Sequence, residues 1–249
     1  MAKIVLLLFL FFIPRAMADF QAGCTAYEAG KYAEALKEFK AEAGVHLSAE
    51  LAYNLGCTEL KLKHPGHAAL WFQRALLLEP GHKESAQNLR FLKKSLALVN
   101  FDVTTMDLVA KLAPLETWRA LMWISFWIVM LCASVLYFLR TKRLWHWVSL
   151  LVLATIAGGI SLAAWVTRSN QIKPQEISIV VDEEGVSAVN VPAGTADTVI
   201  AINAGSQVRR LETRGEWTYV ELPGDTATRG WVRTATLEPL WPFQVPPAA

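Results

Sequence analysis

The stretch ALMWISFWIVMLCASVLYFL, residues 120–139, contains no charged side chain. A second uncharged stretch, VSLLVLATIAGGISLAAWV, follows at 148–166. Because a helix rises about 1.5 Å per residue, about 20 apolar residues cross the roughly 30 Å hydrocarbon core of a bilayer. The two stretches therefore predict two transmembrane helices, at 118–139 and 147–167.

The composition of the spans and their flanks favours the same interpretation. The Leu, Ile, Val and Phe side chains of the first span together favour insertion by roughly 3–6 kcal/mol. Tryptophans lie toward the span ends, where indole rings prefer the headgroup region: Trp118, Trp123, Trp145, Trp147 and Trp165. The alternative is a buried helical hairpin of a soluble protein.

Overall composition narrows the class of protein. A hydrophobic content of 53% excludes a disordered chain, and a net charge of +2 without a basic, aromatic-rich stripe argues against a nucleic-acid partner. Three cysteines are too few to build a disulfide framework. The sequence lacks a Gly-Lys-Ser/Thr phosphate loop and a Gly-x-Ser-x-Gly nucleophile motif, so we expect neither enzymatic activity nor a cofactor.

Residues 1–18 have the features of a signal peptide. Lys3 supplies the positive charge, residues 4–13 the apolar core, and residues 16–18 (Ala-Met-Ala) the cleavage site. An uncleaved anchor and lipidation at Cys24 are the alternatives. Export places residues 19–117 outside the cytoplasm, and two spans return the C-terminal region to that side. The basic loop at 140–146 would then lie inside. We therefore expect a bacterial inner-membrane protein with both soluble domains on the periplasmic side.

A short motif recurs in the first hundred residues at an offset of 33: Gly23-Cys24, Ala35 and Phe39 return as Gly56-Cys57, Ala68 and Phe72. Small residues at 56 and 68 let two helices approach closely, and Phe72 fills the space beside that contact. Pro80 stops the second helix because it lacks an N–H group. The motif therefore predicts pairs of antiparallel helices.

This pattern resembles the tetratricopeptide repeat, a helix pair of about 34 residues. Two repeats and a capping helix at 83–98 would make a small array at 19–98. The resemblance implies that the first helix of each pair lines a groove for peptides or partner helices. At matching positions the groove residues are Phe20, Cys24, Tyr27, Tyr53, Cys57, Leu60, Lys61, Gln87, Phe91 and Lys94. The alternative is that some of these side chains only complete the core.

The cysteines and histidines of the array are candidates for a chemical site. Equivalent residues on packed helices lie about 8–10 Å apart, beyond the roughly 7 Å that a disulfide spans, so we expect Cys24 and Cys57 to be free thiols. A thiol redox role for this pair is an alternative. The histidines fall in turns at opposite ends of the helices, which predicts exposed side chains rather than a metal site: His46, His64, His67 and His82.

The segment at 99–117 is amphipathic, and the spacing of Met106, Val109 and Leu112 predicts a short helix ending near Pro114. It would lie at the membrane interface or against the array. Small residues four apart in the second span favour close helix packing: Ala154/Gly158, Ala157/Ser161 and Gly159/Ala163. The first span offers Ala133 and Ser134 to this contact.

After a linker at 168–175, short runs of β-branched residues separated by Gly and Asp turns predict a small all-β domain at 176–241. Its Gly-Glu-Trp-Thr-Tyr-Val and Gly-Trp-Val segments resemble bacterial SH3-like barrels. By that resemblance, Trp217, Tyr219 and Trp231 are candidate groove residues, although we expect one of the two tryptophans to be core. Four arginines are predicted to form a solvated rim: Arg209, Arg210, Arg214 and Arg229. The Pro-rich tail at 242–249 is predicted to be extended or disordered.

The predicted fold class is thus a multidomain membrane protein: an all-α tetratricopeptide array, a two-helix transmembrane hairpin and an SH3-like barrel. This order resembles the BatE-type proteins of aerotolerance operons. That resemblance implies a non-catalytic role in an envelope-stress complex, beside membrane proteins with von Willebrand A domains and a MoxR-type ATPase. We expect a scaffold for protein partners. The alternatives are a cell-wall tether that binds peptidoglycan and a thiol redox protein.

Overall fold

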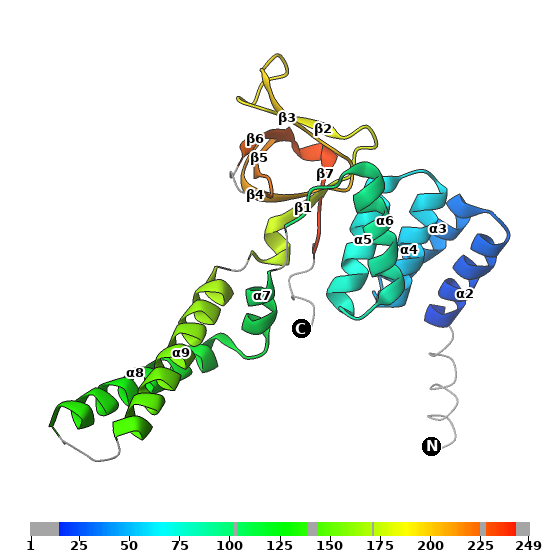
Figure 1. Cartoon of the computed structure of the whole chain (residues 1–249). Coiled ribbons are helices and arrows are strands. Elements are labelled where there is room, and N and C mark those ends of the chain that lie inside the picture. The colour runs from blue at the N-terminus through cyan, green and yellow to red at the C-terminus, as the bar shows by residue number, and fades with distance from the viewer. Residues whose placement is uncertain (1–14, 102–103, 139–143, 171, 225–227, 243–249) are drawn as a thin grey trace, which may run out of the picture. The chain divides into compact units, whose positions relative to one another are not determined.

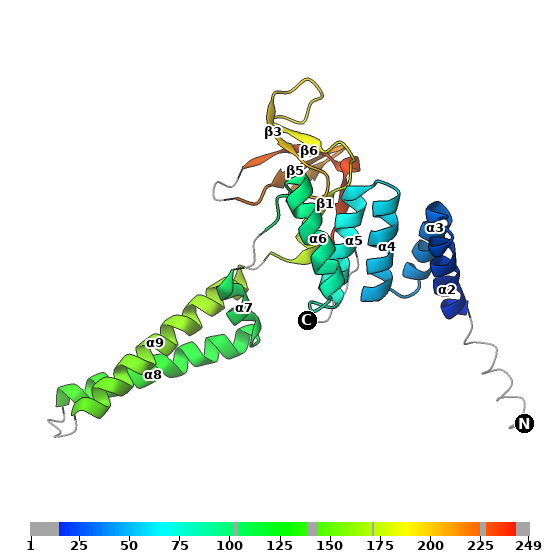
Figure 2. The ribbon, with the colours of Figure 1, turned by 45° about the vertical axis from the view of Figure 1, so that its right-hand side comes forward.

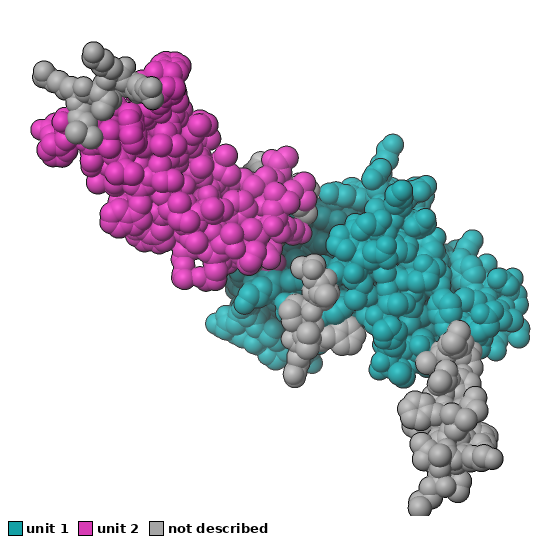
Figure 3. All heavy atoms as spheres, turned by 90° about the horizontal axis from the view of Figure 1, so that it is seen from below, with its two compact units in different colours: residues 1–101, 173–249 teal, residues 102–172 magenta. Residues whose placement is uncertain are grey.

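The computed structural model describes residues 15–101, 104–138, 144–170, 172–224 and 228–242. Helices α2 to α9 and a seven-stranded antiparallel sheet make up the described chain, so the fold is mixed (Figure 1). It divides into two compact units, residues 1–101 with 173–249 and residues 102–172 (Figure 3). Most of the predicted signal peptide and of the Pro-rich tail lies outside the described residues.

The first half of unit 1 consists of five helices that pack side by side in chain order (Figure 2). They are α2 (Arg15–Glu28), α3 (Tyr32–Ala43), α4 (Ala49–Lys61), α5 (Pro65–Leu78) and α6 (Lys83–Leu96). The Ser48 side chain begins α4 by accepting a hydrogen bond from the Leu51 N–H at 3.1 Å. Helix α5 ends two residues before Pro80, as predicted.

Two glycines set the distance between paired helices. A Cβ atom on Gly56 of α4 would lie 2.6 Å from the Phe72 ring of α5. The same contact occurs 33 residues earlier, where a Cβ atom on Gly23 would lie 2.5 Å from the Phe39 ring. Real Cβ atoms do not come that close to a ring, so only glycine permits this helix spacing. The recurring motif therefore marks a recurring tertiary contact.

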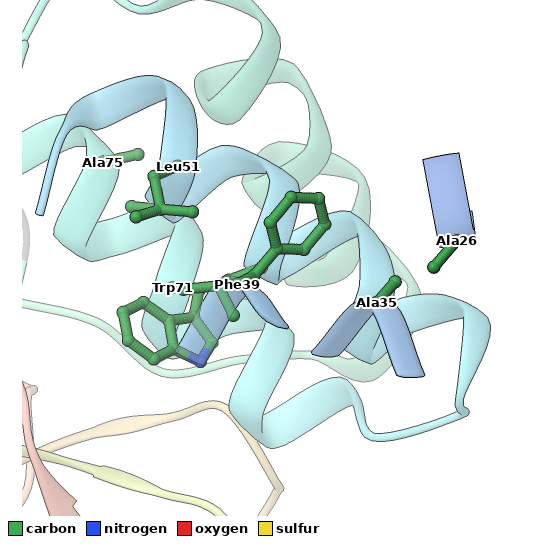
Figure 4. Packing of buried hydrophobic residues seen from close by; sticks show 8 residues of the cluster. Ala26, Ala35, Phe39, Leu51, Trp71 and Ala75 are labelled. Carbon is green, nitrogen blue, oxygen red and sulfur yellow. The ribbon is translucent and has the colours of Figure 1, made fainter. Parts of the chain in front are cut away.

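Buried side chains join these helices into one core. Phe39, Leu51 and Trp71 belong to a cluster that links α3, α4 and α5 (Figure 4). A second cluster around Phe72 and Leu92 links α5 to α6. Since each helix contributes to a cluster shared with its neighbours, the five helices stabilise one another rather than folding singly.

The second half of unit 1 is a sheet with strand order β3-β2-β6-β5-β4-β1-β7, and every pairing is antiparallel. In these described residues β3 and β7 form the two ends, so the sheet is not closed. The strands are β1 (Ile177–Val180), β2 (Val186–Val189), β3 (Thr198–Ile202), β4 (Gln207–Arg214), β5 (Trp217–Glu221), β6 (Arg229–Arg233) and β7 (Leu237–Pro239), with 3-10 turns η1 (Pro174–Glu176) and η2 (Thr234–Thr236). Val180, Val208, Val220 and Val232 fill its core.

Unit 2 contains α7 (Thr105–Lys111), α8 (Leu115–Phe138) and α9 (Leu144–Ser169). Helices α8 and α9 are long and apolar enough to cross a membrane. They pack through small residues, and a Cβ atom on Gly158 would lie 3.2 Å from the Ser125 Cβ. The predicted Ala154/Gly158 pair is at this contact. The predicted partners Ala133 and Ser134 are exposed instead, because the face of α8 that meets α9 carries Ser125 and Cys132.

Helix α7 is the short amphipathic helix that the spacing predicted before Pro114. The Thr104 hydroxyl and the Asp107 carboxylate each bond to the other's backbone N–H, which caps its first turn. Trp118 of α8 donates its indole N–H to the Ala110 carbonyl at 3.1 Å. Helix α7 packs on α9 and leaves Leu108 and Leu112 exposed, so one apolar side of this helix lacks a partner within the described chain.

Candidate functional site

Four of the predicted groove residues lie together, and we call them the Cys–Tyr patch: Cys24 and Tyr27 from α2, and Tyr53 and Cys57 from α4. All four side chains are half-buried. Tyr53 and Cys57 are one helical turn apart and share a hydrogen bond. Asn88 of α6 places its Nδ2 atom 3.8 Å from the Cys57 Sγ atom. Three helices therefore meet at this patch.

Electrostatics in the patch favour neutral thiols. Burial raises the pKa of both Cys24 and Cys57, and the Glu50 carboxylate acts on each thiol in the same direction. A nucleophilic or redox-active cysteine needs the opposite shift, because the thiolate is the reactive form. Cys24 and Cys57 are free, as expected. The direction of the pKa shift argues against the redox alternative.

Tyr53 is also held in its neutral form. Its hydrogen bond with Cys57, together with burial, raises the pKa of the Tyr53 phenol to about 12. The phenol ring lies 6.0 Å from the Phe72 ring and 5.3 Å from the His82 ring, measured between centroids. The Tyr53 ring therefore packs on the helix core, and its hydroxyl group faces Cys57.

His82 connects the patch to nearby carboxylates. Its Nδ1 atom accepts a hydrogen bond from the Ser85 N–H at 3.2 Å and caps α6, so the ring proton sits on Nε2. The Nε2 atom lies 3.5 Å from the Glu50 carboxylate. The prediction of exposed histidines is confirmed for His46 alone: His64 and His67 are half-buried, and the His82 side chain is 8% exposed. The N-terminus of α6 needs an acceptor, and this requirement draws the ring inward.

The remaining predicted groove residues divide into two groups. Phe20 and Leu60 pack against the helix core, as the alternative interpretation held. Lys61, Gln87 and Lys94 are exposed, and the Phe91 side chain is 67% exposed on α6. An aromatic side chain so open to solvent is available for contact with a partner.

The aromatic candidates of the sheet lie on one face. Trp217, Tyr219 and Trp231 project opposite to the core side chains of β5 and β6, and the Tyr219 and Trp231 rings are 5.0 Å apart. We call these three residues the aromatic face. The guanidinium groups of Arg214 and Arg233 lie over Trp231 and Trp217 at 5.4 and 5.8 Å. Trp231 is buried and Trp217 half-buried, but both lie on the face opposite the valine core of the sheet, so neither is the core residue that the sequence led us to expect.

The arginines predicted to form a solvated rim make specific contacts. Arg209 bonds to the Glu176 carboxylate at 3.0 Å, and Arg210 donates to the Gln175 carbonyl at 2.6 Å. Both contacts hold η1 against β4. Arg214 pairs with Glu212 in a bidentate contact at 2.7 and 3.1 Å. Arg209 and Arg210 therefore organise the sheet surface, which the prediction of a simple solvated rim missed, whereas Arg214 and Arg229 are exposed as predicted.

The sequence did not predict that the helices and the sheet pack together within unit 1. The Arg74 side chain of α5 is 4% exposed and crosses to the last strand. It donates to the carbonyls of Leu240 and Pro239 at 3.0 and 2.9 Å and pairs with the Glu238 carboxylate at 2.9 Å. Its guanidinium also lies 4.4 Å from the centre of the Trp71 ring. The one sequence signal was a charged residue inside residues 71–78 of α5, where Gln73 is the only other polar side chain.

A second set of contacts involves the segment after α6. Val99 accepts a hydrogen bond from the Gln207 N–H at 2.8 Å, and Phe101 donates to the Gln207 side chain at 2.9 Å. Gly205, with a φ of +89°, brings the β3–β4 turn against Ala69, whose Cβ would lie 2.9 Å from a Cβ added at Gly205. Helices and sheet are thereby held in one body.

Comparison with known proteins gives no relatives: no family model, curated protein or solved structure matches this chain.

Proposed function

We propose that this protein is a membrane-anchored scaffold that recruits a protein partner through α2, α4 and α6. The observation that supports this most directly is the Cys–Tyr patch, where side chains from separate helices converge as a tetratricopeptide groove would require. Because these side chains are already packed and hydrogen-bonded, a partner orders few of them on binding. Phe91 is exposed on α6, the helix that also carries Asn88, which suits a segment that is partly apolar.

Charge specifies the partner further. Glu28, Glu50 and Glu84 are exposed, and each raises the pKa of a thiol or phenol in the patch, so their negative potential reaches it. Lys61 has the opposite effect, because its positive charge acts to lower the pKa of the Cys57 thiol. Complementary charge guides association and register. The partner segment therefore carries a basic side chain next to an aliphatic or aromatic one.

Helices α8 and α9 would serve as the anchor. Both expose large apolar side chains outward: Trp127 is 66% exposed and Leu153 65% exposed. A soluble hairpin would bury such residues, whereas lipid solvates them. With a signal peptide before them, both soluble regions lie on the periplasmic side of the inner membrane. We further propose that the sheet is an SH3-like domain. The chain would then act in a Bat-type complex, beside von Willebrand A-domain and MoxR-type partners.

The test is capture of the partner by the full chain. Crosslinking in intact cells, followed by purification in detergent, should recover a membrane protein of the Bat type with the unaltered chain. Tyr53→Ala combined with Glu50→Ala should reduce recovery at least tenfold, because the two changes remove the phenol and the carboxylate whose charge reaches the patch. Lys37→Ala, an exposed change on α3 away from the patch, is the matched control and should recover the partner fully. Equal recovery with all three chains would contradict the proposal.

A cell-wall tether is the second candidate, and the aromatic face favours it. Aromatic rings beside Arg233 provide a stacking surface for sugars and a cation for stem-peptide carboxylates. Purified sacculi should then sediment the detergent-solubilised full chain, and Trp217→Ala should release it. The full chain is needed because Arg74 of α5 holds the last strand. Absence of sedimentation with the unaltered chain would eliminate this function.

A further inference from the structure

Helix α7 is fixed at the level where one uncharged stretch begins and the other ends. Ala110 of α7 belongs to one buried cluster with Trp118 of α8 and Ala164 of α9. Trp118 stands two residues before the stretch at 120–139, and Ala164 stands two residues before the end of the stretch at 148–166. Figure 1 and Figure 2 both show α7 beside the end of the hairpin where α8 begins and α9 ends. With α8 and α9 crossing a membrane, as proposed above, this level is the boundary between hydrocarbon and headgroups.

The surface of α7 has three different sides. Because a helix has about 3.6 residues per turn, Leu108 and Leu112 share one side, and Asp107 and Lys111 share the next. The two leucines are 58% and 80% exposed. Met106 lies on a third side and packs against the cluster just described. Helix α7 therefore presents one side to the hairpin, an apolar side outward and a charged side next to the apolar one.

Tryptophans at this end of the hairpin help to hold α7. Trp118 is 9% exposed and donates its indole N–H to the Ala110 carbonyl at 3.1 Å. Trp165 packs against the same cluster. The sequence predicted that both indoles lie in the headgroup region, where they would anchor the hairpin. Since α7 encloses Trp118, the outward apolar surface at this level includes Leu108 and Leu112.

We propose that α7 binds phospholipid, with Leu108 and Leu112 among the acyl chains and Lys111 at the phosphate layer. An amphipathic helix at a membrane surface buries its apolar side about 5–10 Å into the boundary between headgroups and acyl chains. A lysine beside that side keeps its stem among apolar atoms and extends its ammonium group to the phosphates. Lipid thus offers an apolar medium to the leucines and anionic oxygens to the lysine, which water alone does not.

The hairpin allows so short a helix to bind lipid. Helix α7 has only seven residues, but α8 and α9 hold it against the bilayer, where the local concentration of lipid is high. The inserted helix should in turn limit the tilt and rotation of the hairpin, because its buried side contacts both Trp118 of α8 and Ala164 of α9. This inference rests on the proposed membrane anchor and adds a lipid contact to it.

Depth-dependent fluorescence quenching in vesicles tests the proposal. Single cysteines carry an environment-sensitive fluorophore in a full-length chain that also has three substitutions: Cys24→Ser, Cys57→Ser and Cys132→Ala. Leu108→Cys and Leu112→Cys report on α7, and both positions are exposed, so the label displaces no core side chain. Ile156→Cys, near the middle of the second span, reports insertion of the hairpin. Val45→Cys, 80% exposed on a turn of the helical region, is the reference for water.

The vesicles contain phosphatidylcholine and phosphatidylglycerol, with bromines on the acyl chains or iodide in the water on both sides. Bromines near the headgroup end of the chains should quench the probes at residues 108 and 112 and place them about 5–10 Å below the headgroups. Iodide should quench both far less than the probe at residue 45. Lys111→Cys, one residue from Leu112 but on the charged side, is the matched control and should lie among the headgroups, within reach of iodide.

Three results would overturn the proposal. Iodide quenching at residues 108 and 112 as strong as at residue 45, with residue 156 protected, would put α7 in water and leave the membrane anchor intact. Protection of residues 108 and 112 from both iodide and brominated lipid would mean that protein covers α7. Strong iodide quenching at residue 156 would contradict the membrane anchor itself, and the lipid contact with it.

Discussion

At the scale of single residues, Arg74 joins two parts of the chain that are distant in sequence. Its guanidinium contacts two backbone carbonyls, a carboxylate and an indole, so each face of the group has a partner. Burial lowers the pKa of Arg74 while Glu238 raises it, and an arginine this far above neutrality stays charged. A buried charge is tolerated only with such compensation.

We expect Arg74→Met to destabilise unit 1 by about 2–4 kcal/mol. The change leaves the Leu240 and Pro239 carbonyls without their donor, and each unsatisfied buried acceptor costs about 1–3 kcal/mol. Thermal unfolding of the detergent-solubilised chain, followed by tryptophan fluorescence, measures the loss. Arg90→Met, an exposed change on α6, should shift the midpoint little. Equal midpoints for both variants would contradict the role of Arg74.

Tyr53 makes the free energy of unfolding depend on pH in the alkaline range. Its pKa is raised from an ordinary value of about 10 to about 12, so the folded state binds the phenol proton more tightly than the unfolded state. The contribution is complete below pH 10 and is lost as the pH rises through 12. Unfolding in denaturant should therefore give a lower free energy of unfolding at pH 11.5 than at pH 9. This decrease should be smaller in Tyr53→Phe. An identical decrease in both chains would disprove this linkage.

At the scale of elements, helix spacing depends on a glycine opposite a phenylalanine in each pair. Phe39 and Phe72 are each at most 1% exposed, so their rings have no room to move away from an added methyl group. Helices elsewhere gain about 1 kcal/mol from Gly→Ala, whereas overpacking costs about 1–3 kcal/mol. Because the rings are enclosed, the steric cost outweighs the gain in helix propensity, and the net effect of Gly→Ala is destabilising.

Gly23→Ala and Gly56→Ala should both be destabilising, by roughly 1 kcal/mol each. The midpoint of thermal unfolding measures the effect, and the two variants should behave alike because the two contacts are equivalent. Gly81→Ala is the control, since a Cβ at that glycine meets nothing within 4 Å. Stabilisation by Gly56→Ala would mean that helix propensity, not the contact with Phe72, governs this position.

At the scale of the whole molecule, the proposed topology requires both soluble regions on one side of the membrane. In that proposal, a signal peptide and two later crossings would place residues 19–117 and 168–249 together outside, and the basic loop at 140–146 inside. The packing of the helices on the sheet within unit 1 also requires both regions to lie on one side of the membrane. A bilayer between them would forbid contacts such as that of Arg74 with Leu240.

Labelling of single cysteines tests this topology. In spheroplasts, an impermeant maleimide should modify Val45→Cys and Leu211→Cys, both at exposed positions, in a chain that also carries Cys24→Ser, Cys57→Ser and Cys132→Ala. Thr141→Cys, in the loop, should react only after the membrane is opened, because the reagent does not cross lipid. Labelling of residue 141 in closed spheroplasts, or protection of residue 45 or 211, would refute the arrangement.

Local pattern alone determined the two apolar helices, the short helix before Pro114, the end of α5 before Pro80 and the close approach at Gly56. Each depends on residues a few positions apart or on a helix pair joined by a short turn. Tertiary structure alone decided the burial of His82 and the meeting of Arg74 with a strand residue 164 positions later. Hydrophobic periodicity records which face of an element is buried. It carries no record of which distant backbone carbonyls will satisfy a buried charge, because that choice is made only when the elements pack.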